Sequence, residues 1–165
     1  MKIVMSVMNE TVIDYKEDTL HITSKVKDMW RNQRQLSIKN NESFGVLIGS
    51  QSGDVDEIWI ERCTEPKNKD RATRSSFMLK DPEHQKEVDI SFTESDGKLG
   101  YIGTWHTHPE NTPSPSQTDL NDWRECLNRN NDRTLIFVIV GLSDFCVYRF
   151  KGKRFNRIMK EKIDD

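Results

Sequence analysis

Two histidines, His106 and His108, stand on either side of Thr107 and are followed by a proline-rich stretch that leads to Asp119. The largely apolar residues 99–105 before them predict a β-strand. Successive side chains of a strand point to opposite faces, so both imidazoles would share one face and the threonine would take the other. Two imidazoles at this spacing can bind one zinc ion. A catalytic zinc site needs a third protein ligand and keeps an open position for water.

Asp119 is the candidate for that third ligand, because a helix is expected over residues 116–131 and Asp119 would lie in its first turn. The prolines limit the conformations of the loop, which lowers the entropy cost of bringing Asp119 to the strand end. Ser116 and Asp119 also fit a capping box, in which they only satisfy free backbone N–H groups. The two interpretations are compatible for Ser116, since a helix N-terminus can hold both a cap and a catalytic hydroxyl.

The rest of the chain alternates between predicted strands and helices, which indicates a mixed α/β protein with a central sheet and helices on its sides. Helices are expected from Ser24, after Pro82, and over residues 116–131. Residues 64–73 read as a charged loop, and residues 153–165 as either a last strand or a surface helix. Apolar runs and alternation predict strands over residues 2–8, 19–23, 43–51, 56–63, 99–108, 134–142 and 144–152, with a short extended piece at 75–81.

The bulk properties fit one domain over residues 1–165. The formal net charge of -2 gives no sign of a nucleic-acid or membrane partner. The apolar run at the N-terminus is too short and too acidic for a signal peptide, so we expect a cytoplasmic protein.

Cys63, Cys126 and Cys146 form no CxxC pair and are expected to be small, partly buried apolar residues. The basic stretch 151–157 is expected to be a solvated edge strand and not a DNA-binding site.

His106-Thr107-His108-Pro109 and the later Ser116 and Asp119, with ten residues between His108 and Asp119, resemble the HxHP…SxxD core of the JAMM (JAB1/MPN/Mov34) metalloproteases. The resemblance implies a JAB/MPN domain of cytidine-deaminase-like architecture. It also implies Zn²⁺ held by the two histidines and the aspartate, with the serine steadying the oxyanion.

The family has an upstream glutamate in an E-x-x-G pattern, and Glu42 and Gly45 stand at the matching place. Taken alone, Glu42 would be read as a solvated charge at the mouth of a strand. The resemblance instead implies that Glu42 is the general base. It would take a proton from a zinc-activated water and return it to the leaving amine.

The stretch from Trp105 to Arg124 is most similar to compact prokaryotic JAB peptidases of bacterial CBASS anti-phage operons (cyclic-oligonucleotide-based signalling). In such operons an E1–E2-like fusion attaches the C-terminus of a cGAS-like nucleotidyltransferase to targets, and the JAB peptidase removes it. The likeness implies a flexible C-terminal tail lying beside a sheet edge and an isopeptide or peptide bond cut after it. It implies a monomer or weak homodimer as the working unit.

Two other functions stay open. A JAB peptidase that matures a ubiquitin-like sulfur carrier would use the same chemistry on another tail. A non-catalytic MPN binding module would be expected to lack at least one of Glu42, His106, His108 and Asp119, and all four are present. A TIM-barrel hydrolase needs about 250 residues, and a zinc deaminase needs a PCxxC pattern. Residues 62–98 carry no readable motif, although residues 74–77 could be a structural landmark.

Overall fold

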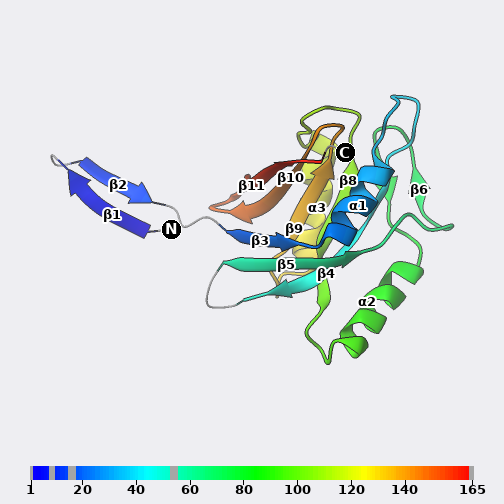
Figure 1. Cartoon of the computed structure of the whole chain (residues 1–165), viewed down its shortest axis with the longest axis horizontal. Helices are drawn as coiled ribbons and strands as arrows, with labels where there is room; N and C mark the ends of the chain where they lie inside the picture. Colours follow the sequence, from blue (N-terminus) through cyan, green and yellow to red (C-terminus); the bar gives the residue numbers. More distant parts are fainter. Residues whose placement is uncertain (1, 8–9, 15–17, 53–55, 164–165) are drawn as a thin grey trace.

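A seven-stranded sheet with the strand order β11-β10-β9-β8-β4-β5-β3 forms the body of the protein (Figure 1). The computed structural model describes residues 2–7, 10–14, 18–52 and 56–163. The strands of this sheet are β3 (Thr19–Ile22), β4 (Phe44–Gln51), β5 (Glu57–Cys63), β8 (Gly100–Thr107), β9 (Ile136–Val140), β10 (Asp144–Lys151) and β11 (Arg154–Lys162). β3 pairs with β5 and β8 with β9 in parallel, and the other neighbours are antiparallel. The predicted mixed α/β fold is therefore confirmed.

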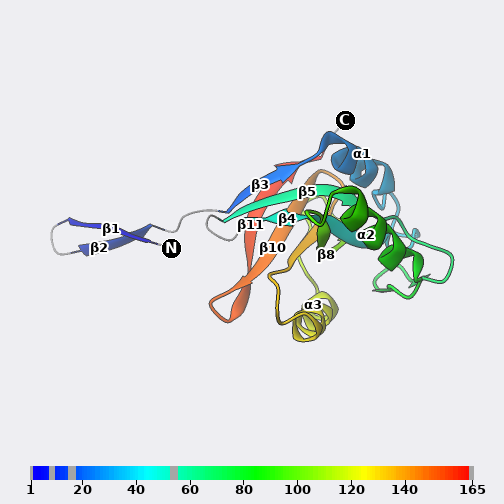
Figure 2. The same cartoon turned by 90° about the horizontal axis from the view of Figure 1, so that it is seen from below.

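Helices cover both faces of this sheet (Figure 2). α1 (Ser24–Gln33) packs on one face, while α2 (Glu83–Glu94) and α3 (Gln117–Arg129) pack on the other. β9 is buried along its whole length and serves both faces. Its Val138 joins the core with Trp30 of α1, and its Phe137 joins the core with Trp123 of α3. This alternation is what a strand covered on both sides requires.

Helix α1 begins at Ser24, as the sequence predicts. Thr23 caps α1 by accepting a hydrogen bond from the Val26 amide at 3.3 Å. Val26 and Trp30 are buried in the core of that face, and Met29 packs against it. Placing the apolar residues of α1 at helical spacing therefore locates the face that meets the sheet.

Four short strands lie outside the main sheet: β1 (Lys2–Val7) pairs with β2 (Glu10–Asp14), and β6 (Arg71–Ala72) with β7 (Phe77–Met78). The expected strand over residues 2–8 extends into residue 8, which lies outside the described residues. The expectation of a charged loop over residues 64–73 was incomplete, because its end forms β6. The extended piece at 75–81 contributes only two residues of strand.

The C-terminal segment is a strand and not a helix, which resolves the alternative left open by its composition. β11 pairs antiparallel with β10 from Arg154 to Lys162 and forms one edge of the sheet. The basic stretch 151–157 holds the last residue of β10, the two-residue turn and the start of the edge strand β11, so the expected edge strand is confirmed. Cys63 and Cys146 are buried free thiols and Cys126 is partly buried, also as expected. Among the described residues, none of the helices has the length and apolar character to cross a membrane.

Candidate active site

The two histidines come from the C-terminal end of β8, a central strand with β4 on one side and β9 on the other. His106 and His108 are buried, with 1% and 7% of their surfaces exposed. Thr107 is fully buried and lies on the opposite face, where its hydroxyl donates a hydrogen bond to Gln35 Oε1 at 3.0 Å. The strand alternation predicted from the HTH sequence is thus confirmed.

A proline-rich loop over residues 109–116 carries the chain from β8 to α3 by packing against the turn between β9 and β10. Leu142 donates its amide to the Glu110 carbonyl at 2.7 Å, and the Thr112 hydroxyl donates to Asp144 Oδ2 at 2.5 Å. A Cβ added at Gly141 would lie 2.6 Å from the Glu110 carbonyl oxygen. The loop is therefore held by a close backbone approach that only glycine permits at this position.

The loop ends at the start of α3, where a complete capping box positions Asp119. Ser116 Oγ accepts a hydrogen bond from the Asp119 amide at 3.1 Å, and Asp119 Oδ2 accepts one from the Ser116 amide at 2.8 Å. The capping box fixes the side chain of Asp119 with its carboxylate turned toward β8. The capping interpretation and the ligand interpretation of Asp119 are therefore compatible.

The three predicted ligand residues meet at one point. His106 Nε2 lies 3.1 Å from His108 Nε2 and 3.2 Å from Asp119 Oδ1, and His108 Nε2 lies 3.1 Å from Asp119 Oδ2. Ligand atoms about 2.0–2.1 Å from a tetrahedral zinc are roughly 3.3 Å apart. The triangle of nitrogen and oxygen atoms therefore fits a small metal ion without rearrangement of the elements.

Glu42 stands beside this triangle, at the entrance to β4. Its Oε1 lies 3.8 Å from His108 Nε2, and it forms with His106 and His108 a group whose ligand atoms lie within 4.8 Å of one another. Asp119 makes shorter contacts with both histidines, so the distances favour Asp119 as the third ligand. Glu42 is buried beside the cluster, with only 4% of its surface exposed.

Burial and mutual charge shift the proton affinities of these groups. Desolvation raises the pKa of Glu42 from 4.5 to about 8, against the opposing charge of His108. Burial alone would also raise the pKa of Asp119, but hydrogen bonds from His106 and His108 outweigh it and hold this pKa well below the usual range. A carboxylate that stays ionised suits a metal ligand, and a carboxylate that readily takes a proton suits a base.

Glu110 orients His108 and is a residue that the sequence interpretation missed. His108 Nδ1 lies 2.8 Å from Glu110 Oε1. An ionised carboxylate only accepts, so Nδ1 of a neutral imidazole carries the proton and the Nε2 lone pair faces the cluster. Such carboxylate–histidine pairs orient metal ligands and raise their basicity. The available signal was an acidic residue two positions after a candidate ligand.

Aromatic side chains pack around His106. Phe77 of β7 lies 5.1 Å from the His106 ring and stacks on Phe44 at 4.7 Å between ring centroids. Trp123 of α3 meets the other side of His106 at 6.3 Å. Phe77 ends the 74–77 stretch singled out as a structural landmark, and its ring packs against His106.

A second buried network, also missed from the sequence, holds the loop that carries β6 and β7. His84 Nδ1 lies 2.6 Å from Thr64 Oγ1, and His84 Nε2 lies 2.6 Å from Asp70 Oδ2. The Thr64 carbonyl accepts the Trp105 indole N–H at 2.9 Å and passes so close to β4 that a Cβ at Gly45 would lie 1.9 Å from it. Close packing against the Thr64 carbonyl therefore explains why the E-x-x-G pattern has glycine at position 45.

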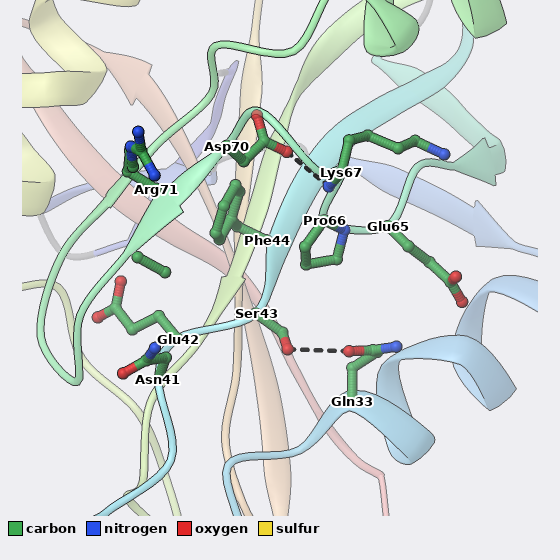
Figure 3. Close-up of a pocket in the computed structure, with 11 residues that line it drawn as sticks. Gln33, Asn41, Glu42, Ser43, Phe44, Glu65, Pro66, Lys67, Asp70 and Arg71 are labelled. Atoms are coloured by element: carbon green, nitrogen blue, oxygen red, sulfur yellow. Dashed lines mark hydrogen bonds between the residues drawn. The ribbon is translucent and has the colours of Figure 1, made fainter.

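An open cavity of about 600 Å³ lies beside Glu42 (Figure 3). Residues 41–44 form one side of it and residues 65–72 the other. β6 therefore runs along the cavity, and within the described residues it pairs only with β7. The residues lining the cavity are Gln33, Asn41, Glu42, Ser43, Phe44, Glu65, Pro66, Lys67, Asp70, Arg71 and Ala72.

Fold and site together define a class: a mixed α/β protein in which a central strand and the helix that follows it assemble a buried His/His/carboxylate cluster compatible with a metal ion. Residues 24–152 match the family of prokaryotic homologs of the JAB domain. The chain belongs to this prokaryotic JAB family, as the resemblance of its motifs predicted.

Similar curated proteins indicate which kind of JAB protein this chain resembles. Three proteins with the name CD-NTase/cGAS isopeptidase are similar to this chain. The Escherichia coli (strain TW11681) protein is 33% identical over 93% of this chain and 94% of its own length. The Vibrio cholerae serotype O1 protein is 38% identical over 68% and 69%, and the Pseudomonas aeruginosa (strain BWHPSA011 / Pa011) protein is 32% identical over 83% and 86%. The predicted likeness to JAB proteins of the CBASS type is confirmed.

A solved structure supports the fold. Protein DSY2949 from Desulfitobacterium hafniense superposes with a TM-score of 0.58, at 23% identity, over 84% of this chain and 89% of that one. At this level of identity the similarity concerns the fold alone.

Proposed function

We propose that the protein is a zinc-dependent isopeptidase that releases a cGAS-like nucleotidyltransferase from the lysine to which its C-terminal tail is joined. The observation that carries the proposal is the cluster of His106, His108 and Asp119 with Glu42 beside it. The names of the three curated relatives supply the substrate class. Zinc is favoured over Mg²⁺ or Ca²⁺ because two of the three ligands are imidazoles.

His106, His108 and Asp119 would hold the zinc ion, and Glu42 would act on the attacking water. Zinc, when bound, supplies a Lewis acid that lowers the pKa of water to about 7 and polarises the scissile carbonyl. Glu42 would take the proton of the attacking water and return it to the leaving lysine amine. Its burial beside the cluster, with a pKa raised by desolvation, suits a group that both accepts and gives up a proton.

Ser116 would steady the oxyanion that develops on the scissile carbonyl. Its oxygen accepts the Asp119 amide in the capping box, and its hydroxyl proton remains available to donate. One well-placed donor of this kind contributes roughly 3 kcal/mol. No covalent intermediate is needed, and the buried thiols of Cys63 and Cys146 take no part.

The open cavity beside Glu42 would receive the substrate tail. Among the described residues β6 pairs with no strand other than β7, and an extended peptide can add to the free edge of a strand through main-chain hydrogen bonds. The tail would then run toward Glu42 and place its last residue next to the cluster. We expect the working unit to be a monomer or weak homodimer in the cytoplasm, with neither nucleic acid nor membrane as a partner.

A gel assay tests the proposal. Wild-type protein and the Glu42→Ala variant would each be incubated with a lysine-linked conjugate of a cGAS-like nucleotidyltransferase, with and without a zinc chelator. Release of free nucleotidyltransferase by the wild type alone, blocked by chelation and restored by zinc, is expected. Release by Glu42→Ala would remove Glu42 from the mechanism.

Two negative outcomes would separate the alternatives. Zinc binding without release would keep the metal site and reject this substrate, and the tail of a ubiquitin-like sulfur carrier would be tested next. A purified protein that neither binds zinc nor gains stability from it would favour the non-catalytic MPN module.

A further inference from the structure

The position of Glu42 must come from its backbone, because its carboxylate has little else to orient it. Within the described part of the chain Oε2 is buried without a hydrogen-bond partner, and Oε1 is 3.8 Å from His108 Nε2. A displacement of about 1 Å in a catalytic group can cost on the order of 100-fold in rate. Whatever holds the backbone of residues 40–43 therefore also sets the activity.

Thr107 holds this segment from the back of the site. Ser43 donates its amide to Thr107 Oγ1 at 2.9 Å, and Thr107 donates its amide to the Ser43 carbonyl at 2.9 Å. The residue next to Glu42 is thereby fastened to the residue between the two histidines. The two halves of the site are joined on the face away from the metal position.

Gln35 completes the connection, with 1% of its surface exposed. Its Oε1 accepts the Thr107 hydroxyl at 3.0 Å, and its Nε2 donates to the Asn40 carbonyl at 2.8 Å and to the Arg74 carbonyl at 3.0 Å. One buried amide thus joins β8, the segment before Glu42 and the turn between β6 and β7.

The β6–β7 turn, which Gln35 bonds at Arg74, also bonds directly to Glu42. Glu42 donates its own amide to the Thr73 carbonyl at 2.8 Å, and Thr73 immediately precedes Arg74, whose carbonyl Gln35 holds. The Glu42 segment is therefore held between β8 and the β6–β7 turn, and Gln35 bonds to all three. A buried, fully satisfied amide in this position gives one unique arrangement of its partners.

We propose that Gln35, acting through Thr107, is a positioning residue that fixes the backbone of Glu42 relative to His106 and His108. The proposal rests on the proposed hydrolysis for its effect on rate, but the fixing itself is a property of the folded chain. Gln35 touches neither metal nor substrate in this assignment.

The test compares Gln35→Met with wild type and with a matched control, Gln51→Met. The side-chain Nε2 of Gln51 also donates to a backbone carbonyl, that of Thr134 at 2.7 Å, but Gln51 lies at the far end of β4. For Gln35→Met we expect kcat on the conjugate to fall about tenfold or more, KM to change by less than about threefold, and bound zinc per chain to stay unchanged. Gln51→Met should match the wild type.

A second measurement does not depend on activity. Amide hydrogen exchange in metal-free protein should be about tenfold faster at Glu42 and Ser43 in Gln35→Met than in wild type, with the amides of β9 unchanged. If wild type fails to cleave the conjugate, the proposed function fails, and this exchange still decides whether Gln35 holds the segment. Unchanged exchange at Glu42 and Ser43 would overturn the proposal. Faster exchange with an unchanged kcat in an active enzyme would overturn it as well.

A pair of substitutions at Thr107 covers the case in which Gln35→Met does not fold. Thr107→Val keeps the volume but loses the hydroxyl, and Thr107→Ser keeps the hydroxyl. The serine variant should recover most of the kcat that the valine variant loses, at equal zinc content. Equal kcat in both variants would show that the Thr107 hydroxyl, and with it the bond to Gln35, has no positioning role.

Discussion

The carboxylate of Asp119 both caps a helix start and faces the two histidines of the cluster. Its Oδ2 accepts the Ser116 amide at 2.8 Å while lying 3.1 Å from His108 Nε2, and its Oδ1 lies 3.2 Å from His106 Nε2. A cap needs only an oxygen acceptor, whereas a zinc ligand needs an ionised oxygen. The two roles can therefore be separated by a substitution that removes the charge and keeps an oxygen.

Asp119→Asn is that substitution. We expect zinc affinity to fall at least about 100-fold, because loss of an outer partner of a ligand alone costs 10- to 100-fold. The helix should be retained, since one oxygen can still accept the Ser116 amide. Competition with a chromophoric chelator measures the affinity, and circular dichroism measures the helix. Zinc binding as tight as in wild type would mean that Asp119 is not a ligand.

Replacing Glu42 by glutamine should have opposite effects on activity and on the stability of the zinc-free protein. In the protein without zinc its pKa is raised by burial from 4.5 to about 8. Between these values the folded state keeps a proton that the unfolded state has lost, so the contribution of Glu42 to stability falls as pH rises through this interval. Glu42→Gln has no charge to bury and escapes this loss.

Without zinc, Glu42→Gln should therefore be more stable than wild type by roughly 2 to 4 kcal/mol at pH 8, with the difference vanishing near pH 4.5. The same variant should lose turnover when zinc is restored. Urea unfolding in the presence of a chelator, from pH 4.5 to 8, measures the first effect. Equal stability at pH 8 would show that solvent reaches the carboxylate of the zinc-free protein.

At the scale of elements, the ligand geometry depends on how the proline-rich loop is fastened to the turn between β9 and β10. Gly141 is the closest point of that contact, with the Glu110 carbonyl oxygen and Pro113 Cδ both 2.6 Å from where a Cβ would lie. A side chain there must push the loop outward, and α3 with Asp119 follows the loop. A change that touches no ligand should therefore alter the metal site.

Gly141→Ala should weaken zinc binding by about tenfold or more and lower the melting temperature. Gly100→Ala is the matched control, because a Cβ at Gly100 of β8 would have nothing within 4 Å. Zinc competition and thermal unfolding of both variants check the prediction. If the two variants bind zinc equally well, the loop does not set the position of Asp119.

The elements and the clustered residues that the sequence located are those specified by local patterns. Strand alternation placed His106 and His108 on one face, and helix-start chemistry placed Ser116 and Asp119 in the first turn of α3. The last strand was ambiguous, because its partly exposed edge position leaves only a weak apolar pattern in residues 153–165. Such an edge is identified by its pairing with β10, which is not a local property.

The residues that were missed act through partners far along the chain or through a bond that no short pattern specifies. Gln35 meets Thr107 across 72 positions, and Thr64 meets His84 across 20. The residues next to Gln35 or His84 in the sequence do not indicate that either side chain makes such a bond. The polar connections that position Glu42 become visible only once the sheet brings β4, β8 and the β6–β7 turn together.

At the scale of the whole molecule, a zinc ion would join the end of β8 to the start of α3, in addition to the hydrogen bonds that fasten the connecting loop. A ligand that binds the folded state alone stabilises it by RT ln(1 + [L]/Kd), about 2.7 kcal/mol at 100 times Kd. The unfolded chain offers only scattered ligands, because its four histidines and three cysteines include one close pair, His106 and His108.

Free zinc buffered at 100 times its Kd should therefore raise the melting temperature of the wild type by about 5 to 10 °C relative to chelated protein. His108→Ala should lose most of that gain, since a ligand is missing. Glu42→Ala should keep it, because Glu42 stands beside the metal and does not hold it in the proposed assignment. A loss of the gain in Glu42→Ala would instead make Glu42 a ligand, as its place within 4.8 Å of both histidines allows. Calorimetry of the three proteins at matched free zinc therefore distinguishes base from ligand without measuring activity.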